Sequence, residues 1–177
     1  MALDVRMLRS EDDRTRFESG NIELDRFFRR YAGQNQFKHH IGTTYVAVDG
    51  EQILGYVTVS GSQIEIPDLP LTKRRKLPKY PLPVLRLARL AIGQQVQGQG
   101  MGELLLKTVF MLAWQMADDF GCVGVVVDAK AEAVAFYGRY GFTVMKEVEH
   151  GQLGDRPRPT PMFLELKAIP RPSRAAT

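Results

Sequence analysis

The sequence predicts an α/β fold, in which helices flank a mixed β-sheet within a single domain. Three observations predict it: apolar runs of strand length, a strand–glycine turn–long helix pattern in the second half, and a length of 177 residues that suits one core. Apolar residues make up 44% and charged residues 25%, as in globular proteins. We expect one domain over residues 1–169 and a disordered tail over residues 170–177.

A strand and two amphipathic helices are expected first. Apolar side chains alternate over residues 1–10, which predicts the strand. Ser19 or Asn21 is placed to cap the first helix. Apolar residues at the spacing of one helical face define its expected buried side: Leu24, Phe27, Phe28 and Tyr31.

A hairpin, a basic connection and a long strand are expected next. Residues 43–48 and 53–60 are strand-like, and the Asp-Gly pair between them predicts a tight turn. Five prolines in residues 67–83 predict a connection, because proline lacks the backbone N–H that strands and helices need. Residues 84–92 form a long apolar run and predict a strand.

The second half alternates helices and strands. Residues 103–119 predict a helix that is apolar almost all around and therefore buried. The β-branched run at residues 123–127 predicts a buried strand, and residues 131–139 predict a helix. Residues 142–149 and 162–167 predict the last two strands.

The composition excludes several classes of protein. A single cysteine, Cys122, allows no intramolecular disulfide and no zinc site built from several thiolates. No pair or triad of ligands has a spacing that suits a metal, so we expect none. The first residues lack the apolar stretch of a signal peptide, and no run reaches the roughly 18 apolar residues of a membrane span. We expect a cytoplasmic protein without a membrane partner.

The glycine-rich turn before the long helix is the strongest motif. It reads Gln97, Gly98, Gln99, Gly100, Met101, Gly102. Unobstructed N–H groups at a helix N-terminus suit a di- or triphosphate, whereas a tight turn with positive φ would need the same glycines. A dinucleotide-binding motif would need a glycine where Glu103 stands, and the Gly-Lys-Ser/Thr end of a nucleotide-triphosphate loop is absent.

What remains is Gln-x-x-Gly-x-Gly, which resembles the acetyl-CoA motif of the GNAT superfamily of N-acetyltransferases. Leu90-Ala91-Ile92 matches its central strand, and Phe136-Tyr137 followed by Gly141-Phe142 matches its later "FY…GF" stretch. The element order agrees over nearly the whole chain. The resemblance implies a GNAT fold with acetyl-CoA as the acetyl donor. It implies these cofactor contacts: Ala91, Ile92, Gln97, Gly98, Gln99, Gly100, Met101, Gly102 and Phe136.

A narrower resemblance concerns the GNAT toxins of type II toxin–antitoxin systems. It rests on FESGN at residues 17–21, LARLA at residues 87–91 and DAK at residues 128–130. Such toxins acetylate the α-amine of aminoacyl-tRNA and stop translation. The resemblance implies that substrate, a ribbon–helix–helix antitoxin and a homodimer. Two alternatives remain: a housekeeping GNAT enzyme of a small amine or protein N-terminus, and a binding module without catalysis, against which the intact motif and Tyr137 argue.

Acetyl transfer to an amine needs a neutral amine, donors for an oxyanion and a proton for the leaving thiolate. An α-amine has a reference pKa of about 7.7–8.0, so a strong general base is optional. Backbone N–H groups near Ala91 and Ile92 are candidate oxyanion donors. The resemblance assigns the proton donor to Tyr137, with Tyr140 as the competing tyrosine that we expect to be structural. We expect Cys122 to be a buried apolar residue rather than an acetyl carrier.

Basic residues gather between positions 73 and 89. Seven lie there without an intervening acid: Lys73, Arg74, Arg75, Lys76, Lys79, Arg86 and Arg89. Because the whole chain is only +4, the asymmetry suits a phosphate-rich partner, although a solvated loop or the CoA 3′-phosphate also fits. We expect Lys73, Arg74, Arg75 and Lys76 to bind substrate. Arg86 and Arg89 should face opposite sides of a strand, with Arg89 holding the acceptor or antitoxin, or alternatively a structural ion pair.

Overall fold

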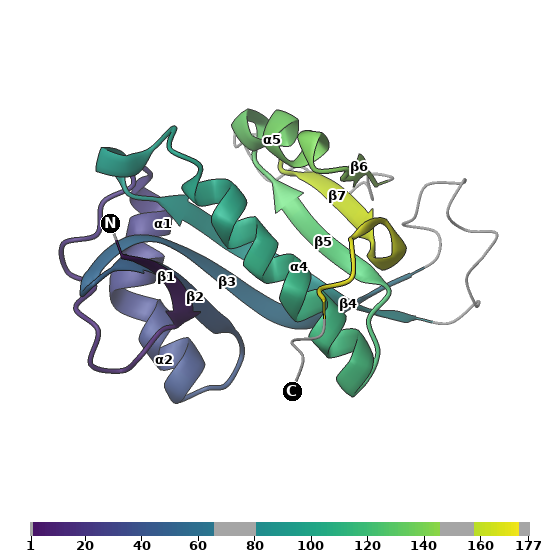
Figure 1. Cartoon of the computed structure of the whole chain (residues 1–177), viewed down its shortest axis with the longest axis horizontal. Helices are drawn as coiled ribbons and strands as arrows, with labels where there is room; N and C mark the ends of the chain where they lie inside the picture. Colours follow the sequence, from purple (N-terminus) through teal and green to yellow (C-terminus); the bar gives the residue numbers. More distant parts are fainter. Residues whose placement is uncertain (1, 66–80, 146–157, 174–177) are drawn as a thin grey trace. The chain divides into compact units, whose positions relative to one another are not determined.

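The computed structural model describes residues 2–65, 81–145 and 158–173. Within them the strands form a seven-stranded mixed sheet in the order β1-β2-β3-β4-β5-β7-β6, with helices on its faces (Figure 1). The predicted α/β fold is confirmed. The strands are β1 (Leu3–Met7), β2 (Thr43–Asp49), β3 (Gln52–Ile64), β4 (Leu82–Ile92), β5 (Gly124–Ala129), β6 (Thr143–Val144) and β7 (Thr160–Glu165). The α-helices are α1 (Ile22–Arg26), α2 (Ala32–Phe37), α4 (Met101–Asp119) and α5 (Val134–Arg139).

Two compact units make up the chain. The first comprises Met1–Ser60 and Leu87–Phe110, and the second comprises Gly61–Arg86 and Met111–Thr177.

The predicted hairpin of the first unit is confirmed. Gly50 turns the chain between β2 and β3 with φ of +60°, a conformation that favours glycine. Asp49 pairs with Gln52 beside the turn. A bulge between Ala47 and Val48 then shifts the pairing by one residue. β1 runs antiparallel to β2 and forms the edge of the sheet.

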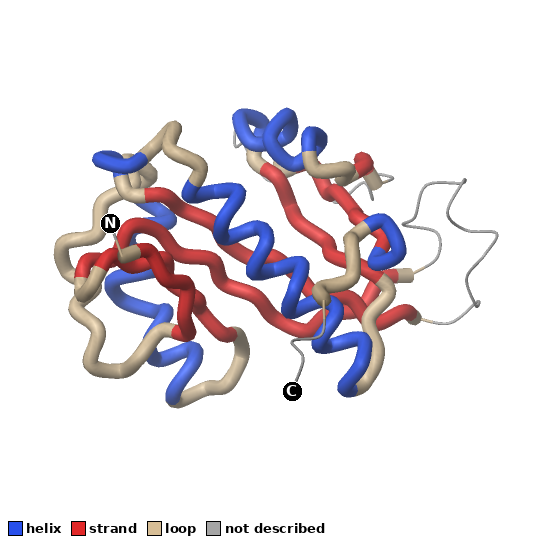
Figure 2. Tube along the Cα trace, in the orientation of Figure 1, coloured by secondary structure: helices blue, strands red, loops and turns tan. Residues whose placement is uncertain are grey.

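One continuous helical segment replaces the two expected helices (Figure 2). Asn21 caps its start, because its side-chain oxygen accepts a hydrogen bond from the Leu24 N–H at 3.0 Å. The middle of the segment, Phe27–Tyr31, is a π-helical turn in which the Ala32 N–H donates to the Phe27 carbonyl. Arg14 donates to the carbonyl of Phe28 in this wide turn at 3.1 Å.

The π-turn makes the predicted position of Tyr31 wrong. A wide turn adds one residue, which moves every later side chain around the helix axis by about 100°. Tyr31 is therefore 44% exposed, and Ala32 takes the buried place expected for it. Phe27 and Phe28 precede the shift and are buried as predicted.

An aromatic cluster forms the core of the first unit. Tyr56 of β3 is fully buried and its ring packs against the ring of Phe28, with centroids 4.4 Å apart. The rings of Phe17 and Phe27 complete the cluster. The Tyr56 hydroxyl donates to the carbonyl of Leu24 in α1 at 2.7 Å. This bond satisfies the one polar group in the cluster and holds α1 against β3.

α4 covers the opposite face of β3. A Cβ placed on Gly55, the neighbour of Tyr56, would lie 3.2 Å from the Leu105 side chain of α4. Adjacent strand residues point to opposite faces, so α1 and α4 flank the sheet. α4 begins at Met101, two residues before the predicted start. Exposed Glu103, Lys107, Met111 and Gln115 recur at helical spacing, so α4 is amphipathic rather than buried all around as expected.

β5 and β7 form the centre of the second unit. They pair antiparallel, with Val126 opposite Phe163, and both side chains are buried. Gly124 has no room for a side chain, because a Cβ there would lie 2.3 Å from the Leu164 carbonyl oxygen. The strand predicted over residues 142–149 is a two-residue strand, β6, in its described part, and residues 146–157 lie outside the described ranges.

The described C-terminal residues pack on α4. The Trp114 indole N–H donates to the carbonyl of Ile169 at 3.0 Å. The guanidinium of Arg171 lies 4.7 Å from the Trp114 ring centroid and pairs with Asp118 at 2.8 Å. Arg171 belongs to the tail expected to be disordered, so the start of that tail has defined contacts; residues 174–177 lie outside the described ranges. In the part of the chain that is described, no helix is long and apolar enough to cross a bilayer.

Candidate active site

The glycine-rich turn joins β4 to α4 and leaves its backbone open. Gly98 and Gly100 have φ of +77° and +84°, which explains the choice of glycine at both. A Cβ at either position would meet no protein atom within 4 Å. The first hydrogen bond of α4 runs from the Leu104 N–H to the Gly100 carbonyl at 3.1 Å. The preceding amides of α4 therefore have no acceptor within the helix, and they lie at the positive end of the helix dipole.

Side chains of the motif hold the turn in place. Gln97 donates from its side-chain amide to the carbonyls of Ser19 at 2.7 Å and Ile92 at 3.1 Å. Its predicted cofactor contact is thereby limited to its backbone and its side-chain oxygen. Met101 is buried among Leu54 and Val96, so only its backbone can reach a ligand. A rigid, open cradle of N–H groups results, and it fits a pyrophosphate group.

The end of β4 carries the predicted oxyanion donors. Ala91 is buried in the aromatic core, and Ile92 packs with the cluster beneath the turn. The next amide, that of Gly93, donates to the Leu54 carbonyl at 2.8 Å. The Gln94 amide donates to the Glu18 carbonyl at 2.9 Å. These bonds fix the strand end from which the Ala91 and Ile92 backbone would act.

Tyr137 lies on α5 with a buried ring and an available hydroxyl. The residue is 4% exposed, and its ring packs edge-on against Phe136 and Phe142. Burial raises the pKa of its hydroxyl above the usual range, so the group stays protonated at neutral pH. Among the described residues the hydroxyl has no hydrogen-bond partner. These surroundings are compatible with the predicted role of Tyr137 as a proton donor, whereas the hydroxyl of Tyr56 is bonded to α1.

Tyr140 and Cys122, the alternative candidates for a catalytic role, lie in different surroundings from Tyr137. Tyr140 is half-exposed and packs edge-on against Phe136. Phe136 is half-buried between these two tyrosines, beside Arg139 at 5.9 Å. Cys122 is buried, and desolvation raises the pKa of its thiol, so the nucleophilic thiolate is disfavoured. This supports the expectation that Cys122 is an apolar core residue.

Among the described residues, Arg89 does not form the structural ion pair that was its alternative role. Its guanidinium lies 3.7 Å from the centroid of the Phe27 ring, a cation–π contact, and no acid among the described residues pairs with it. Arg86, three residues earlier on β4, pairs instead with Asp128 of β5 at 2.8 Å. The predicted Lys73, Arg74, Arg75 and Lys76 lie outside the described residues.

Sequence reasoning missed two cavities of the first unit. One, of about 260 Å³, is lined in part by Arg89, Thr44 and Thr58. The other, of about 250 Å³, is lined by Arg26, Arg29 and Arg30 together with Glu18, Ile22 and Asp25. Arg29 donates to the carbonyl of Phe17, and Ser19 donates to the Asp25 carboxylate at 2.6 Å. The sequence signal for the second cavity was the close spacing of three arginines in one helical segment.

Metal ligands are not gathered in the described ranges, where no group of three or more His, Cys, Asp or Glu side chains could hold an ion.

Comparisons with known proteins agree with this geometry. Residues 16–166 match the Acetyltransferase (GNAT) domain family. A tRNA-acetylating toxin of Mycobacterium tuberculosis is 32% identical over 140 residues, which cover 78% of this chain and 83% of that protein.

Solved structures of two toxins are also similar. A tyrosine-to-phenylalanine mutant of KacT is 31% identical with a TM-score of 0.82, and covers 94% of this chain and 96% of its own. AtaT in complex with acetyl-methionyl-tRNAfMet is 28% identical with a TM-score of 0.80 and the same coverage. A tyrosine-to-phenylalanine mutant of the AtaT toxin, bound to the C-terminus of the antitoxin AtaR and acetyl-CoA, is 26% identical with a TM-score of 0.72, and covers 94% of this chain and 95% of its own. On the family match and the open glycine cradle, the chain belongs to the GNAT acetyltransferase family.

Proposed function

We propose that this chain transfers the acetyl group of acetyl-CoA to the α-amine of aminoacyl-tRNA and thereby blocks translation. The observation that carries the proposal is the open amide cradle at the start of α4, in a GNAT chain whose relative is named a tRNA-acetylating toxin. An acetylated α-amine can no longer attack a peptidyl ester, so a charged tRNA modified in this way is lost to elongation.

The chain's backbone binds and orients the donor. Acetyl-CoA, when bound, supplies an activated acetyl thioester. The amides of Gly98, Gly100 and the first turn of α4 hold its pyrophosphate, and the fixed end of β4 directs the Ala91 and Ile92 backbone toward the thioester carbonyl. Gln97 keeps the turn attached to β4 through its two carbonyl contacts. Positioning of this kind supplies much of the rate of an amine acylation.

Tyr137 holds the proton that the leaving sulfur requires. Its pKa is raised by burial, so the hydroxyl keeps its proton until it is needed, and no described residue competes for it. The similar toxin KacT has been solved with a tyrosine replaced by phenylalanine, which is compatible with a functional tyrosine in this family. Arg89 supports acceptor binding, because its charge is not neutralised by a described acid. Lys73, Arg74, Arg75 and Lys76 would add contacts to tRNA phosphates.

Partners follow from the same function. AtaT bound to AtaR supports an antitoxin as a partner of this chain, and the toxin resemblance supports the ribbon–helix–helix type and a homodimer. Because charged tRNA is consumed at ribosomes, the function places the protein in the cytoplasm.

A cell-free translation reaction tests the proposal. The purified chain should stop protein synthesis only when acetyl-CoA is added, and fresh aminoacyl-tRNA should restore it transiently. Tyr137→Phe should remove most of the inhibition, since general acid catalysis contributes about 10²–10⁴-fold, while acetyl-CoA still binds. Tyr140→Phe is the matched control and should inhibit like the wild type. Inhibition without acetyl-CoA, or an active Tyr137→Phe variant, would contradict the assigned chemistry.

A further inference from the structure

The cavity beside Arg89 combines a polar floor with a charged rim. It lies between α2, β2, β3 and β4, and its volume is about 260 Å³. Phe27 and Ala32 form an apolar wall, while Asn35, Thr44, Thr58 and Arg89 supply the polar groups. Pockets for whole small molecules measure about 300–1,000 Å³, so this one suits a fragment of a ligand.

Two paired threonines form the floor. Thr44 of β2 lies opposite Thr58 of β3, and their hydroxyl oxygens are 2.7 Å apart. The pair has two hydroxyl hydrogens, and the bond between them uses one. The hydroxyls make no other hydrogen bond among the described residues, so one donor and several lone pairs remain available to a ligand.

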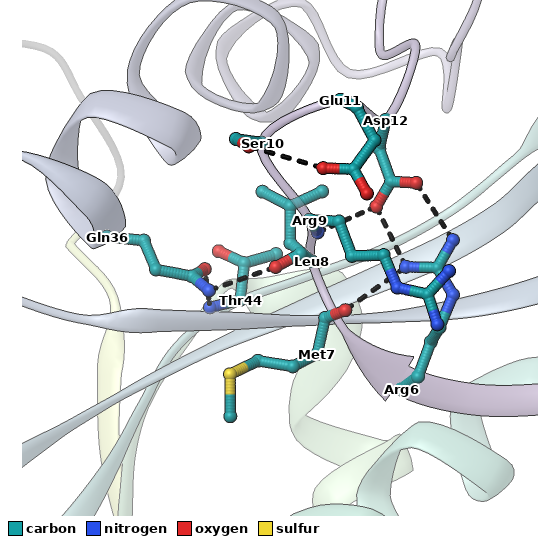
Figure 3. A network of polar contacts seen from close by, with 9 residues as sticks. All are labelled: Arg6, Met7, Leu8, Arg9, Ser10, Glu11, Asp12, Gln36 and Thr44. Atoms are coloured by element: carbon teal, nitrogen blue, oxygen red, sulfur yellow. Dashed lines mark hydrogen bonds and ion pairs between the residues drawn. The ribbon is translucent and has the colours of Figure 1, made fainter.

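The floor is held rigidly by a buried glutamine. Gln36 of α2 accepts from the Thr44 N–H at 2.9 Å and donates to the Leu8 carbonyl at 3.1 Å (Figure 3). Thr44 itself is 1% exposed. A hydroxyl pair fixed in this way is preorganised for a hydrogen-bonding ligand and disfavours an apolar one of the same shape.

The rim carries a positive charge, and no carboxylate of the described residues lines the cavity. Arg89 is oriented by its contact with the Phe27 ring at 3.7 Å. Asp25, the buried acid of this unit, is not among the lining residues, and its carboxylate accepts hydrogen bonds from Ser19. A cation in the cavity would face a guanidinium without compensation.

The cavity also lies within reach of the acceptor amine. Arg89 precedes the proposed reaction point at Ala91 and Ile92 by two to three residues of β4, or about 7–10 Å along the strand. Ala88 and Arg89 line the cavity, so it borders the stretch of β4 that leads to that point.

We propose that this cavity receives the aminoacyl side chain of the acceptor, and that it selects neutral side chains with a hydrogen-bonding group and rejects cationic ones. The inference rests on the proposed function and names the substrate class of the same site. Thr44 and Thr58 bond the side chain, and Arg89 excludes lysyl and arginyl acceptors.

One tRNA body charged with different amino acids tests the selection, because only the side chain then varies. Using the full chain and labelled acetyl-CoA, kcat/KM is compared for threonyl against isosteric valyl, and for glutaminyl against lysyl acceptors. The wild type should favour threonyl and glutaminyl, each by about tenfold or more. A wild-type ratio near one in both pairs would overturn the proposal.

Two variants locate the selection in this cavity. Thr44→Val with Thr58→Val removes both partners of the pair, which avoids an unsatisfied hydroxyl, and should bring the threonyl/valyl ratio to near one. Arg89→Gln should lower the glutaminyl/lysyl ratio at least fivefold, and it decides the matter if the double variant does not fold. Thr43→Val, on the same strand but outside the cavity lining, should leave both ratios unchanged.

The acceptor ratios distinguish a failure of the cavity proposal from a failure of the proposed function. If the variants lower kcat/KM for all acceptors equally, the cavity binds a part common to every tRNA, such as the terminal ribose or phosphate, and the proposal is wrong. If the wild type labels no aminoacyl-tRNA while binding acetyl-CoA, the proposed function itself fails, and the inference falls with it.

Discussion

The substitution Gly100→Ala tests whether Gly100 is needed only for the turn or also for binding acetyl-CoA. Gly100 has φ of +84°, so an alanine there costs about 1–2 kcal/mol of backbone strain. Its methyl group would meet no protein atom within 4 Å, so no steric term is added in the free protein. The same methyl would project from the proposed pyrophosphate cradle. We therefore expect a modest loss of stability and at least a tenfold loss of acetyl-CoA affinity.

Gly50 provides the matched control. It also has positive φ, +60°, and a Cβ there would meet nothing within 4 Å, but it lies in the β2–β3 turn. Gly50→Ala should lower the unfolding free energy by about the same 1–2 kcal/mol and leave acetyl-CoA affinity unchanged. Urea unfolding measures the first quantity and titration calorimetry the second. Equal acetyl-CoA affinity in both variants would refute the cradle and reduce Gly100 to a turn residue.

Three further predictions concern stability. Tyr56→Phe removes the buried hydrogen bond to α1 and should cost about 1–2 kcal/mol in urea unfolding, whereas an unchanged midpoint would refute the bond's role. Hydrogen bonds from Arg6 hold the pKa of Asp12 below its usual value; this contribution is present above the unfolded pKa near 3.9 and is lost as the pH falls through the folded pKa. Asp12→Asn should therefore flatten the decline of Tm below about pH 4, and an identical decline would contradict this. Gly124→Ala forces a Cβ to within 2.3 Å of the Leu164 carbonyl oxygen and should cost about 3 kcal/mol, so a wild-type Tm would contradict the close pairing.

Local patterns with a strong steric cause could be predicted from the sequence. The Asp-Gly turn has φ of +60° at its glycine, as the hairpin requires, and the glycines before α4 adopt the positive φ that made them noticeable. Asn21 caps its helix through a side-chain oxygen, which is the interaction that its residue type favours. Each of these features depends on only a few neighbouring residues.

Irregularities in register could not be predicted. No propensity marks the π-turn at Phe27–Tyr31, yet it rotates Tyr31 out of the core. The bulge beside Ala47 likewise shifts the pairing of β2 with β3 by one residue. Counting back from the turn without a bulge would place Thr44 opposite Val57, so the pairing of Thr44 with Thr58 could not be predicted before the register was known.

Partners brought together by tertiary packing were also beyond the sequence. Arg89 and Phe27 are far apart in the chain, and nothing local indicated that the guanidinium would stack on that ring rather than pair with an acid. The sequence selected Tyr137 only through the family resemblance, whereas its burial, and the lack of a hydrogen-bond partner for its hydroxyl among the described residues, come from the structure. The assignments of Tyr137 and of the cofactor contacts stay predictions.

Acetyl transfer from labelled acetyl-CoA into a mixture of acceptors tests the central claim most directly. The mixture contains charged tRNA, uncharged tRNA, polyamines and short peptides. We expect label in charged tRNA alone, and its release from the tRNA as an acetylated amino acid on deacylation. Label in polyamines or peptides would keep the family and the donor but contradict the toxin function, and no label despite bound acetyl-CoA would contradict the claim that the chain acetylates aminoacyl-tRNA.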